Sequence, residues 1–364
     1  MTPDTLDSGP LRGVKAFTPV EGPAVWYADE LGQHPEQWTF TLSEDHIREL
    51  EAAVEATEHV GSEIQEITLN DVTLPTLAPL LKRFLSEVVD GRGFQLIKGL
   101  PVDRWTRRQT VAAYWILGLH WGRAASNNHR GHLVGHIKDL GHDPARAETR
   151  LYATTAAQPF HNDAADLVSL LCLHEAQEGG DSRWASSWAV HNEFLRRRPD
   201  LGPVMTRDWF FDRKGEVPRG KKPYFAIPVF NYFRGNLTVN WSSNYYFSSQ
   251  RHEEVPRLTQ DHLDAIELFD ALAASPRHAI RYRLQPGDIQ LLSNHTVLHA
   301  RDAFVDSHPD PARKRHLLRL WLAPPNERPL PDAYLDVLGD SVEIGKRGGI
   351  VLENTKLHVP LEAE

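Results

Sequence analysis

Residues 159–173 read PFHNDAADLVSLLCL, and this stretch combines two patterns that decide the fold. Its second half, from residue 167 onward, is a continuous apolar run of strand length, which is typical of a strand buried on both faces. Its first half places His161 and Asp163 two residues apart in a chain that we expect to be extended. Side chains two apart on a strand project to the same side, so this pair can hold one cation.

The His-x-Asp pattern carries little weight alone, because the chain has 19 histidines. It also occurs at residues 262–264 and 308–310. The first of these falls in a predicted helix, where residues two apart point in different directions. The second lies in a proline-rich loop without apolar support. Local context therefore favours residues 161–163, and the plain alternative is a surface His and Asp at the start of a strand.

A third ligand has to come from a distant segment, and the candidate is GDIQLLSNHTVLHARDAF at residues 287–304. A turn and a predicted strand there lead to two histidines, His295 and His299. Two histidines and one carboxylate on one face of an ion suit Fe(II). They leave the opposite positions open for a chelating cosubstrate and for dioxygen.

An arginine gives an independent signal. Residues 317–322 read LLRLWL, a predicted core strand with Arg319 in its middle. Arginine keeps its proton, and burying it unpaired is costly. The strand therefore implies either a bound carboxylate or an internal acidic partner. A planar guanidinium can hold a carboxylate through two parallel hydrogen bonds.

The rest of the chain predicts helices first and short strands later. An irregular arm over residues 1–40 precedes helices expected at 41–57 (with Thr41 and Glu44 as a capping box), 77–89 and 106–121 (opened by Thr106 with Gln109). A strand is expected at 94–98 between the last two. From about residue 150, short strands are expected at 167–173, 224–230, 237–241, 280–284, 289–292 and 317–322, with one helix at 260–273 after Thr259.

This order of elements predicts a fold class and a division of the chain. We expect a mainly β, α+β protein with a helical N-terminal third packed on a sandwich, jelly roll or barrel. Residues 1–60 would form an arm and a helix packed on the core, and residues 61–364 the functional domain.

Composition limits the partners and the compartment. The 364 residues carry a net charge of −9 without a basic cluster, which argues against nucleic acid. The longest apolar run is too short for a bilayer, and the first ten residues do not resemble a signal peptide. Cys172 is the only cysteine, so no internal disulfide can form. We expect a cytoplasmic protein with a small-molecule substrate and no membrane or nucleic-acid partner, and a homo-oligomer is compatible with the sequence.

Five segments in order resemble the Fe(II)/2-oxoglutarate-dependent dioxygenases of the taurine dioxygenase (TauD/TfdA, clavaminate-synthase-like) family. They are GRGFQLIKGLP at 91–101, PFHNDAADL at 159–167, GGDSRWASS at 179–187, PGDIQLLSNHTVLHARDAF at 286–304 and RHLLRLWL at 315–322. The resemblance covers about residues 75–325. It implies a double-stranded β-helix (jelly-roll) core over about 90–325, with Fe(II), 2-oxoglutarate and O2 as cofactor and cosubstrates.

The resemblance also implies site residues. His161, Asp163 and His299 are similar to the family's iron ligands, with His295 as a neighbour. Ser182 occupies the place of a hydroxyl residue that contacts 2-oxoglutarate.

The cosubstrate-binding arginine that the resemblance implies is Arg319. Arg315, four residues earlier on the same strand face, is the alternative, because a proline-rich loop lengthens the spacing from the last iron ligand.

The implied reaction is oxidation of a small organic metabolite with release of succinate and CO2. Relatives that halogenate replace the carboxylate ligand, so Asp163 favours hydroxylation. Desaturation or ring closure would use the same ligands and stays an alternative. A zinc hydrolase or a non-catalytic cupin-like binding protein would need no role for Ser182 or Arg319.

Four residues are expected to contact the substrate. Asn128 and His136 belong to the polar loop at 126–136, which precedes the segment that carries His161 and Asp163. Trp241 belongs to NWSSNYYFSSQR at 240–251, although such a cluster can equally be strand core. Arg301 follows His299 closely and could attract an acidic substrate, although a surface ion pair is the plain alternative.

Overall fold

The structure, a computed structural model, describes residues 13–58, 60, 63–339, 341–350 and 352–364. Its larger sheet has seven strands in the order β1 (Thr39–Thr41), β2 (Phe94–Lys98), β14 (Ile289–Ser293), β6 (Leu167–His174), β17 (His316–Ala323) and β3 (Arg123–Ala125), with β4 (Val134–Lys138) also paired to β17. The smaller sheet has the order β13 (Ala279–Tyr282), β8 (Ser182–Ser186), β15 (Val297–Arg301) and β5 (Gln158–His161).

Three two-stranded sheets, eight α-helices and seven short 3-10 helices complete the described elements. The two-stranded sheets pair β9 (Asp208–Asp212) with β10 (Tyr224–Pro228), β11 (Phe230–Phe233) with β12 (Asn236–Val239), and β7 (Glu178–Gly179) with β16 (Phe304–Val305). The α-helices are α1 (Ala28–Leu31), α2 (Glu44–Thr57), α3 (Leu77–Val89), α4 (Arg107–Leu119), α5 (Ser187–Arg197), α6 (Gly202–Met205), α7 (Ser243–Ser249) and α8 (Gln260–Ala274).

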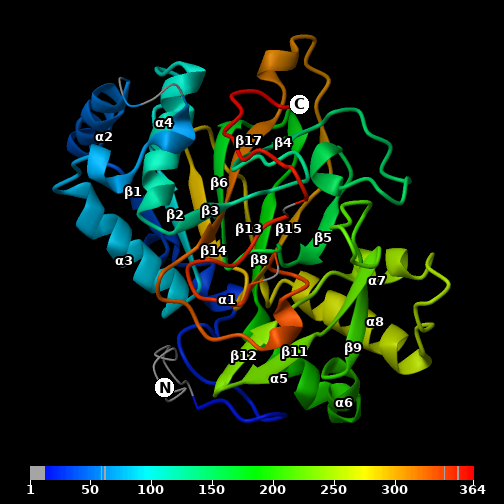
Figure 1. The fold of residues 1–364 in the computed structure, drawn as a ribbon. Coiled ribbons are helices and arrows are strands. Elements are labelled where there is room, and N and C mark those ends of the chain that lie inside the picture. The colour runs from blue at the N-terminus through cyan, green and yellow to red at the C-terminus, as the bar shows by residue number, and fades with distance from the viewer. Residues whose placement is uncertain (1–12, 59, 61–62, 340, 351) are drawn as a thin grey trace, which may run out of the picture.

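The two main sheets face each other, and helices cover their outer faces (Figure 1). Apolar residues of α2, α3 and α4 form one core with the outer face of the larger sheet. Residues of α5 and α8 form a second core with the smaller sheet and the strands β9 to β12. A third core lies between the two sheets, where Phe94 and Trp321 of the larger meet Trp184 of the smaller.

Alternation along the strands decides which side chains face the interior. In β17, Leu317 and Trp321 belong to the core between the sheets, whereas Leu318 and Leu320 pack on the helices. Arg319 shares the parity of the inward set, since residues two apart point to the same face. The central strands are therefore largely apolar on both sides, which is why they appear in the sequence as nearly continuous apolar runs.

Most predicted elements are confirmed, some to the residue. The helix over 77–89 and the strand over 94–98 match α3 and β2, and Thr106 with Gln109 forms the capping box that opens α4. The first long helix begins later than predicted, because Ser43 and His46, not Thr41 and Glu44, form its capping box.

Several helices and strands were not predicted. The helices among them are α1, α5, α6 and α7, and the strands are β1, β3, β4, β7, β8, β9, β15 and β16. The loop predicted at 126–136 contains the start of β4. Helices make up 29% and strands 23% of the described residues. The predicted mixture of helices and strands is therefore confirmed, whereas the expected excess of strand over helix is not observed.

The described part of the N-terminal arm is bonded to the sheets. Trp26 Nε1 donates to the carbonyl of Arg92 at 2.8 Å, and Leu42 N donates to Lys98 O at 2.9 Å. The domain boundary at residue 60 stays a prediction, and residues 1–12 of the arm lie outside the described residues.

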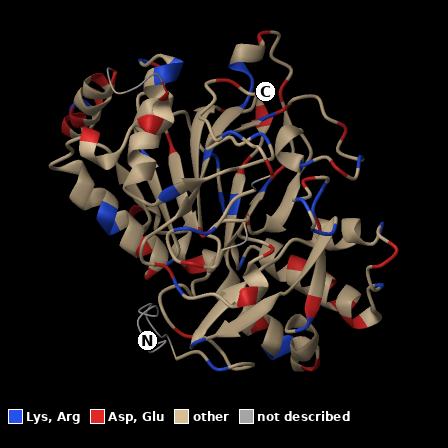
Figure 2. Ribbon diagram, in the orientation of Figure 1, with Lys and Arg blue, Asp and Glu red and all other residues tan. Residues whose placement is uncertain are grey.

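Charge is distributed without a single-sign face. Acidic and basic segments intermingle over the ribbon in the view of Figure 2. In the described residues, we find no helix that is both long and apolar enough to cross a bilayer.

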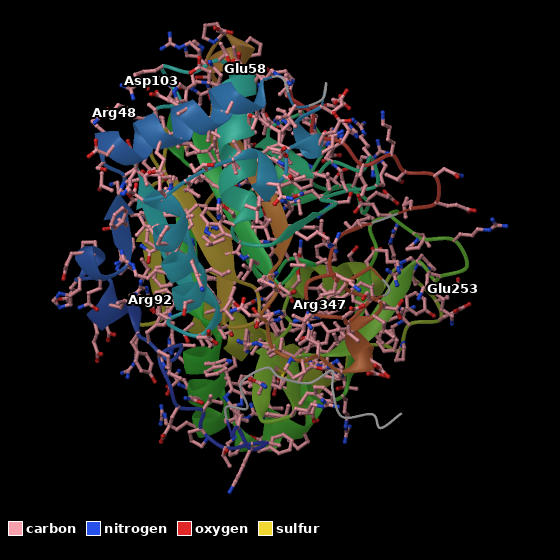
Figure 3. The ribbon with its side chains drawn as sticks, turned by 60° about the vertical axis from the view of Figure 1, so that its left-hand side comes forward. Arg48, Glu58, Arg92, Asp103, Glu253 and Arg347 are labelled. Atoms are coloured by element: carbon pink, nitrogen blue, oxygen red, sulfur yellow. The ribbon has the colours of Figure 1, made fainter. Side chains whose placement is uncertain are left out.

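A buried network of charged side chains joins Arg347, in the C-terminal segment, to Asp166, which directly precedes β6. Arg347, which Figure 3 places within the body of the molecule, donates from Nε to both oxygens of Asp166, at 2.8 and 3.0 Å. Nε2 of His295 lies 2.7 Å from the same carboxylate. All three side chains are almost inaccessible to solvent. Removing one partner would leave a buried charge uncompensated.

We expect Arg347→Met to lower the free energy of unfolding by about 3–5 kcal/mol, because Asp166 would lose its only guanidinium partner among the described residues. Urea denaturation followed by fluorescence measures the change. Lys346→Met is the matched control, since that neighbouring cation is exposed and should cost under about 0.5 kcal/mol. Equal effects of the two substitutions would contradict the role given to Arg347.

Candidate metal centre

Two strands of the smaller sheet and the turn after one of them bring three ligand types together. β5 ends at His161, and its antiparallel register places that residue opposite His299 of β15. The two imidazole rings lie 4.2 Å apart, centre to centre. Asp163 follows β5 and turns its carboxylate toward both rings.

The spacing of the donor atoms suits a first-row metal ion. His161 Nε2 lies 3.7 Å from Asp163 Oδ1, and His299 Nε2 lies 3.7 Å from Asp163 Oδ2. One ligand atom from each residue falls within 4.8 Å of the others. Donor atoms about 3–4 Å apart match metal bonds of about 2.0–2.2 Å. Both histidines are only 8% exposed.

Hydrogen bonding presets the ring of His161 for coordination. Its Nδ1–H donates to the carbonyl of Pro159 at 2.9 Å, which leaves the Nε2 lone pair facing Asp163. Burial, with nearby His299, lowers the pKa of His161 to about 3, so the ring is neutral at physiological pH, as a metal ligand must be. The side-chain amide of Gln158 lies 2.9 Å from the same Nε2.

The carboxylate of Asp163 is held through one oxygen. Trp321 Nε1 donates to Oδ2 at 2.8 Å, and Arg319 Nη1 lies 3.5 Å from the same atom. Burial works to raise the pKa of Asp163, but Arg319 and His299 hold it well below its usual range, so the group is ionised. With Oδ2 engaged, Oδ1 is the freer oxygen for a single bond to an ion.

The alternative histidine and a second cluster of possible ligands both lie outside the triad. His295 is engaged with Asp166 and is not part of the triad. A second cluster combines His132, His358 and Glu364. There, Asn128 Nδ2 donates to Nδ1 of His132 at 3.1 Å, so Nε2 carries the proton and has no lone pair for a metal.

Two cavities meet at the triad. The larger has a volume of about 280 Å³ and the smaller about 40 Å³. Both are lined by Tyr152, Gln158, His161, Asp163 and Arg319. An ion held by the triad would therefore be reached from two sides.

The smaller cavity contains the predicted Ser182 and the arginine given as the alternative. Arg315 is 5% exposed and lines this cavity with Ser182. Burial lowers the pKa of Arg315 to about 10, and its Nη1 has no hydrogen-bond partner among the described residues.

Arg319 lies differently from what the sequence predicts. It faces Asp163, donates from Nε to Asn127 Oδ1 at 2.7 Å, and stacks on Trp321 with its guanidinium carbon 4.5 Å from the ring centre. The internal acidic partner that the sequence left open is therefore present. The sequence predicts that Arg319, rather than Arg315, binds the cosubstrate carboxylate. In the structure, Arg319 already faces the carboxylate of Asp163.

Three of the four expected substrate contacts line neither cavity. His136 lies opposite Leu318, on the helix-facing side of the larger sheet, and bonds to His316 and Pro360. Asn128 is engaged with its neighbour in the loop. Trp241 is core, packed on Phe269 with its Nε1 donating to Asp270. The structure therefore places these three residues away from both cavities.

Arg301, the fourth, lines the smaller cavity and not the larger one.

Residues that sequence analysis missed line the larger cavity. Arg150 donates to Glu216 Oε2 and to the Asn127 carbonyl at 3.1 and 3.0 Å, and its guanidinium lies over the rings of Tyr152 and Trp321. Arg213 and Lys221 both contact Asp336. Most of these residues lie outside regular strands and helices, where no periodic signal could have indicated them.

The profile of the family described as "Taurine catabolism dioxygenase TauD, TfdA family" matches residues 53–321. The chain belongs to this family. It is a 2-oxoglutarate-dependent non-haem iron oxygenase, and the resemblance, the enzyme class and the cofactors predicted from five sequence segments are confirmed. The zinc-hydrolase and non-catalytic alternatives are thereby excluded.

Two curated relatives cover most of the chain. FR-33289 synthase of Streptomyces rubellomurinus (strain ATCC 31215) is 30% identical over 321 residues, which are 86% of this chain and 93% of the relative. Taurine hydroxylase-like protein SAT17 of Stachybotrys chartarum (strain CBS 109288 / IBT 7711) is 27% identical over 80% of this chain and 78% of the relative.

Solved structures share the fold. Asparagine oxygenase in complex with Fe(II), 2S,3S-3-hydroxyasparagine and succinate superposes with a TM-score of 0.59 at 17% identity, over 78% of this chain and 93% of that one. Non-heme iron oxygenase OrfP with Fe and alpha-ketoglutaric acid gives 0.58 at 14% identity over the same shares.

We expect Trp321→Phe to weaken Fe(II) binding about 10- to 100-fold, because Asp163 Oδ2 would lose its shortest hydrogen bond and the carboxylate its fixed orientation. Anaerobic titration against a competing chelator measures the affinity. Trp209→Phe is the control, since its Nε1 donates to a backbone carbonyl in the other core. Unchanged Fe(II) affinity in Trp321→Phe would refute the positioning role.

Proposed function

We propose that this enzyme hydroxylates a small, charged organic metabolite at an iron held by His161, Asp163 and His299. The observation that carries the proposal is the buried triad at the meeting point of two cavities. One cavity can take the cosubstrate and the other the substrate, so both can approach one ion from different sides.

We infer that the two facing sheets are the two halves of a double-stranded β-helix over about residues 90–325. The inward alternation of β17 and β15 and the shared core between the sheets support this assignment. The fold likeness to asparagine oxygenase and OrfP is consistent with it.

The smaller cavity is the proposed cosubstrate site, with Ser182 and Arg315 at its far end from the metal. A buried guanidinium with a free N–H needs an anion. A dicarboxylate that chelates the iron with one end would bring its second carboxylate to Arg315. Arg319 is already paired with Asp163, so we propose that it orients this iron ligand. We assign the binding of the cosubstrate to Arg315, which reverses the order predicted from the sequence.

When bound, iron and 2-oxoglutarate supply the oxidative chemistry, in which the cosubstrate becomes succinate and CO2 and a substrate C–H bond is oxidised. The chain's own residues orient the metal ligands and shield the site from water. Pro159 fixes the proton of His161 on Nδ1, and Trp321 and Arg319 hold one oxygen of Asp163. Burial of the triad excludes bulk water.

The larger cavity is the proposed substrate site. Its walls combine aromatic rings with charges of both signs, which favours a small molecule that itself carries charge. They include Arg150, Glu216, Asp336 and Tyr245. The complexes of asparagine oxygenase with hydroxyasparagine and of OrfP with (3S)-hydroxy-L-Arg support an amino acid or a similar organic acid, and support hydroxylation over desaturation.

We expect Fe(II) and 2-oxoglutarate, added without oxygen, to produce a visible charge-transfer band that His299→Ala abolishes together with succinate release. His295→Gln should keep the band, because His295 contacts Asp166 and not the triad. Absorption spectroscopy and succinate assays measure both. A band that survives in His299→Ala but disappears in His295→Gln would reassign the ligand.

We expect Arg315→Met to raise the KM for 2-oxoglutarate about 10- to 100-fold, the loss of one charge-assisted hydrogen bond. Arg319→Met should change this KM less and weaken Fe(II) binding more, because its partner is Asp163. Steady-state kinetics and metal titration separate the two effects. The opposite pattern would restore the assignment to Arg319.

A further inference from the structure

A second arginine occupies the smaller cavity beside Arg315. Arg301 is 7% exposed, and two of its nitrogens, Nε and Nη1, have no hydrogen-bond partner among the described residues. Nη1 of Arg315 is likewise unpartnered. Both guanidinium groups lie over the ring of Phe304, with their central carbons 4.8 and 5.1 Å from its centre.

The strand register brings these groups to one end of the cavity. Arg301 pairs with Ser182 across β15 and β8, and Arg315 Nη2 donates to the carbonyl of Gly180 at 3.3 Å. His299 lies two residues before Arg301 on β15, so the two side chains share a face about 7 Å apart along the strand. The metal ligand and the two arginines therefore line one short cavity.

Neither guanidinium has an acidic partner within ion-pair distance in the part of the chain that the structure describes. The groups that act on them, Asp139 on Arg301 and Cys172, Asp306 and Asp181 on Arg315, form no ion pair with either guanidinium. Asp306 accepts a hydrogen bond from the backbone N–H of Arg315 and not from its guanidinium. Two like charges buried together are unfavourable unless an anion joins them.

We propose that Arg301 is a second binding residue for the distal carboxylate of 2-oxoglutarate, which it and Arg315 hold between them. The inference rests on the proposed function, since it takes the smaller cavity as the cosubstrate site. The competing explanation is purely structural. Arg301 Nη2 donates to the carbonyl of Ala156 and lies 3.5 Å from that of Leu151, so the side chain could serve only to fasten this segment.

The deciding experiment compares two ligands on the Fe(II)-loaded protein without oxygen. 2-Oxoglutarate and 2-oxopentanoate share the chelating end, but only the first has a distal carboxylate. Titrations that follow the charge-transfer band give both dissociation constants for the native chain, Arg301→Met, Arg301→Gln and Arg281→Met. Arg281 is the control, an exposed arginine on β13 paired with Asp181 and Asp302.

We expect Arg301→Met and Arg301→Gln to weaken 2-oxoglutarate about 10- to 100-fold and to leave 2-oxopentanoate within about twofold. Arg281→Met should change neither. The Gln variant removes the charge but keeps an N–H donor near the position of the Arg301 Nε. Equal weakening of both ligands, or none, would overturn the proposal. If the native chain gave no band with 2-oxoglutarate, the proposed function itself would fail, which is a distinguishable result.

Discussion

A buried carboxylate with one oxygen engaged is the constraint on which this site depends. Asp163 lies where two sheets and two cavities meet, and it must stay ionised without water. Trp321 and Arg319 make this possible by binding Oδ2 from the opposite sheet. Because both come from β17, the larger sheet orients a ligand that follows a strand of the smaller one, and the metal centre exists only when the sheets face each other.

The positive charges of the interior divide into two kinds. Arg319, Arg150 and Arg347 each have an acidic partner, so they organise the protein. Arg315 and Arg301 have none within ion-pair distance in the described chain, so they are available to a ligand. A buried arginine in a sequence shows only that an anion is needed; the partner across the interior shows whether the protein already supplies it.

This dependence on distant partners explains which features of the fold and the site could be predicted from the sequence. Apolar runs predicted β2 and β14 because their strands are buried on both faces, and ordered motifs predicted the family. The resemblance ranked Arg319 above Arg315, but the sequence could not show the surroundings of these two arginines, which lie four apart on one strand face. Their surroundings, Gly180 for one and Asp163 for the other, come from distant strands. The position of His136 away from the cavities could not be predicted for a related reason, since the face that it occupies follows from its register with β17, which no local pattern encodes.

The tie between Arg347 and Asp166 has a consequence for biosynthesis. The two residues are 181 positions apart, and at bacterial or eukaryotic translation rates of about 5–20 residues per second the ribosome needs roughly 10–40 s to deliver the guanidinium after the carboxylate. During that interval Asp166 has no guanidinium partner at this position, so burying it would leave its charge uncompensated. The segment that leads from the metal ligands into β6 is therefore expected to pack in its dry interior only after Arg347 has been synthesised.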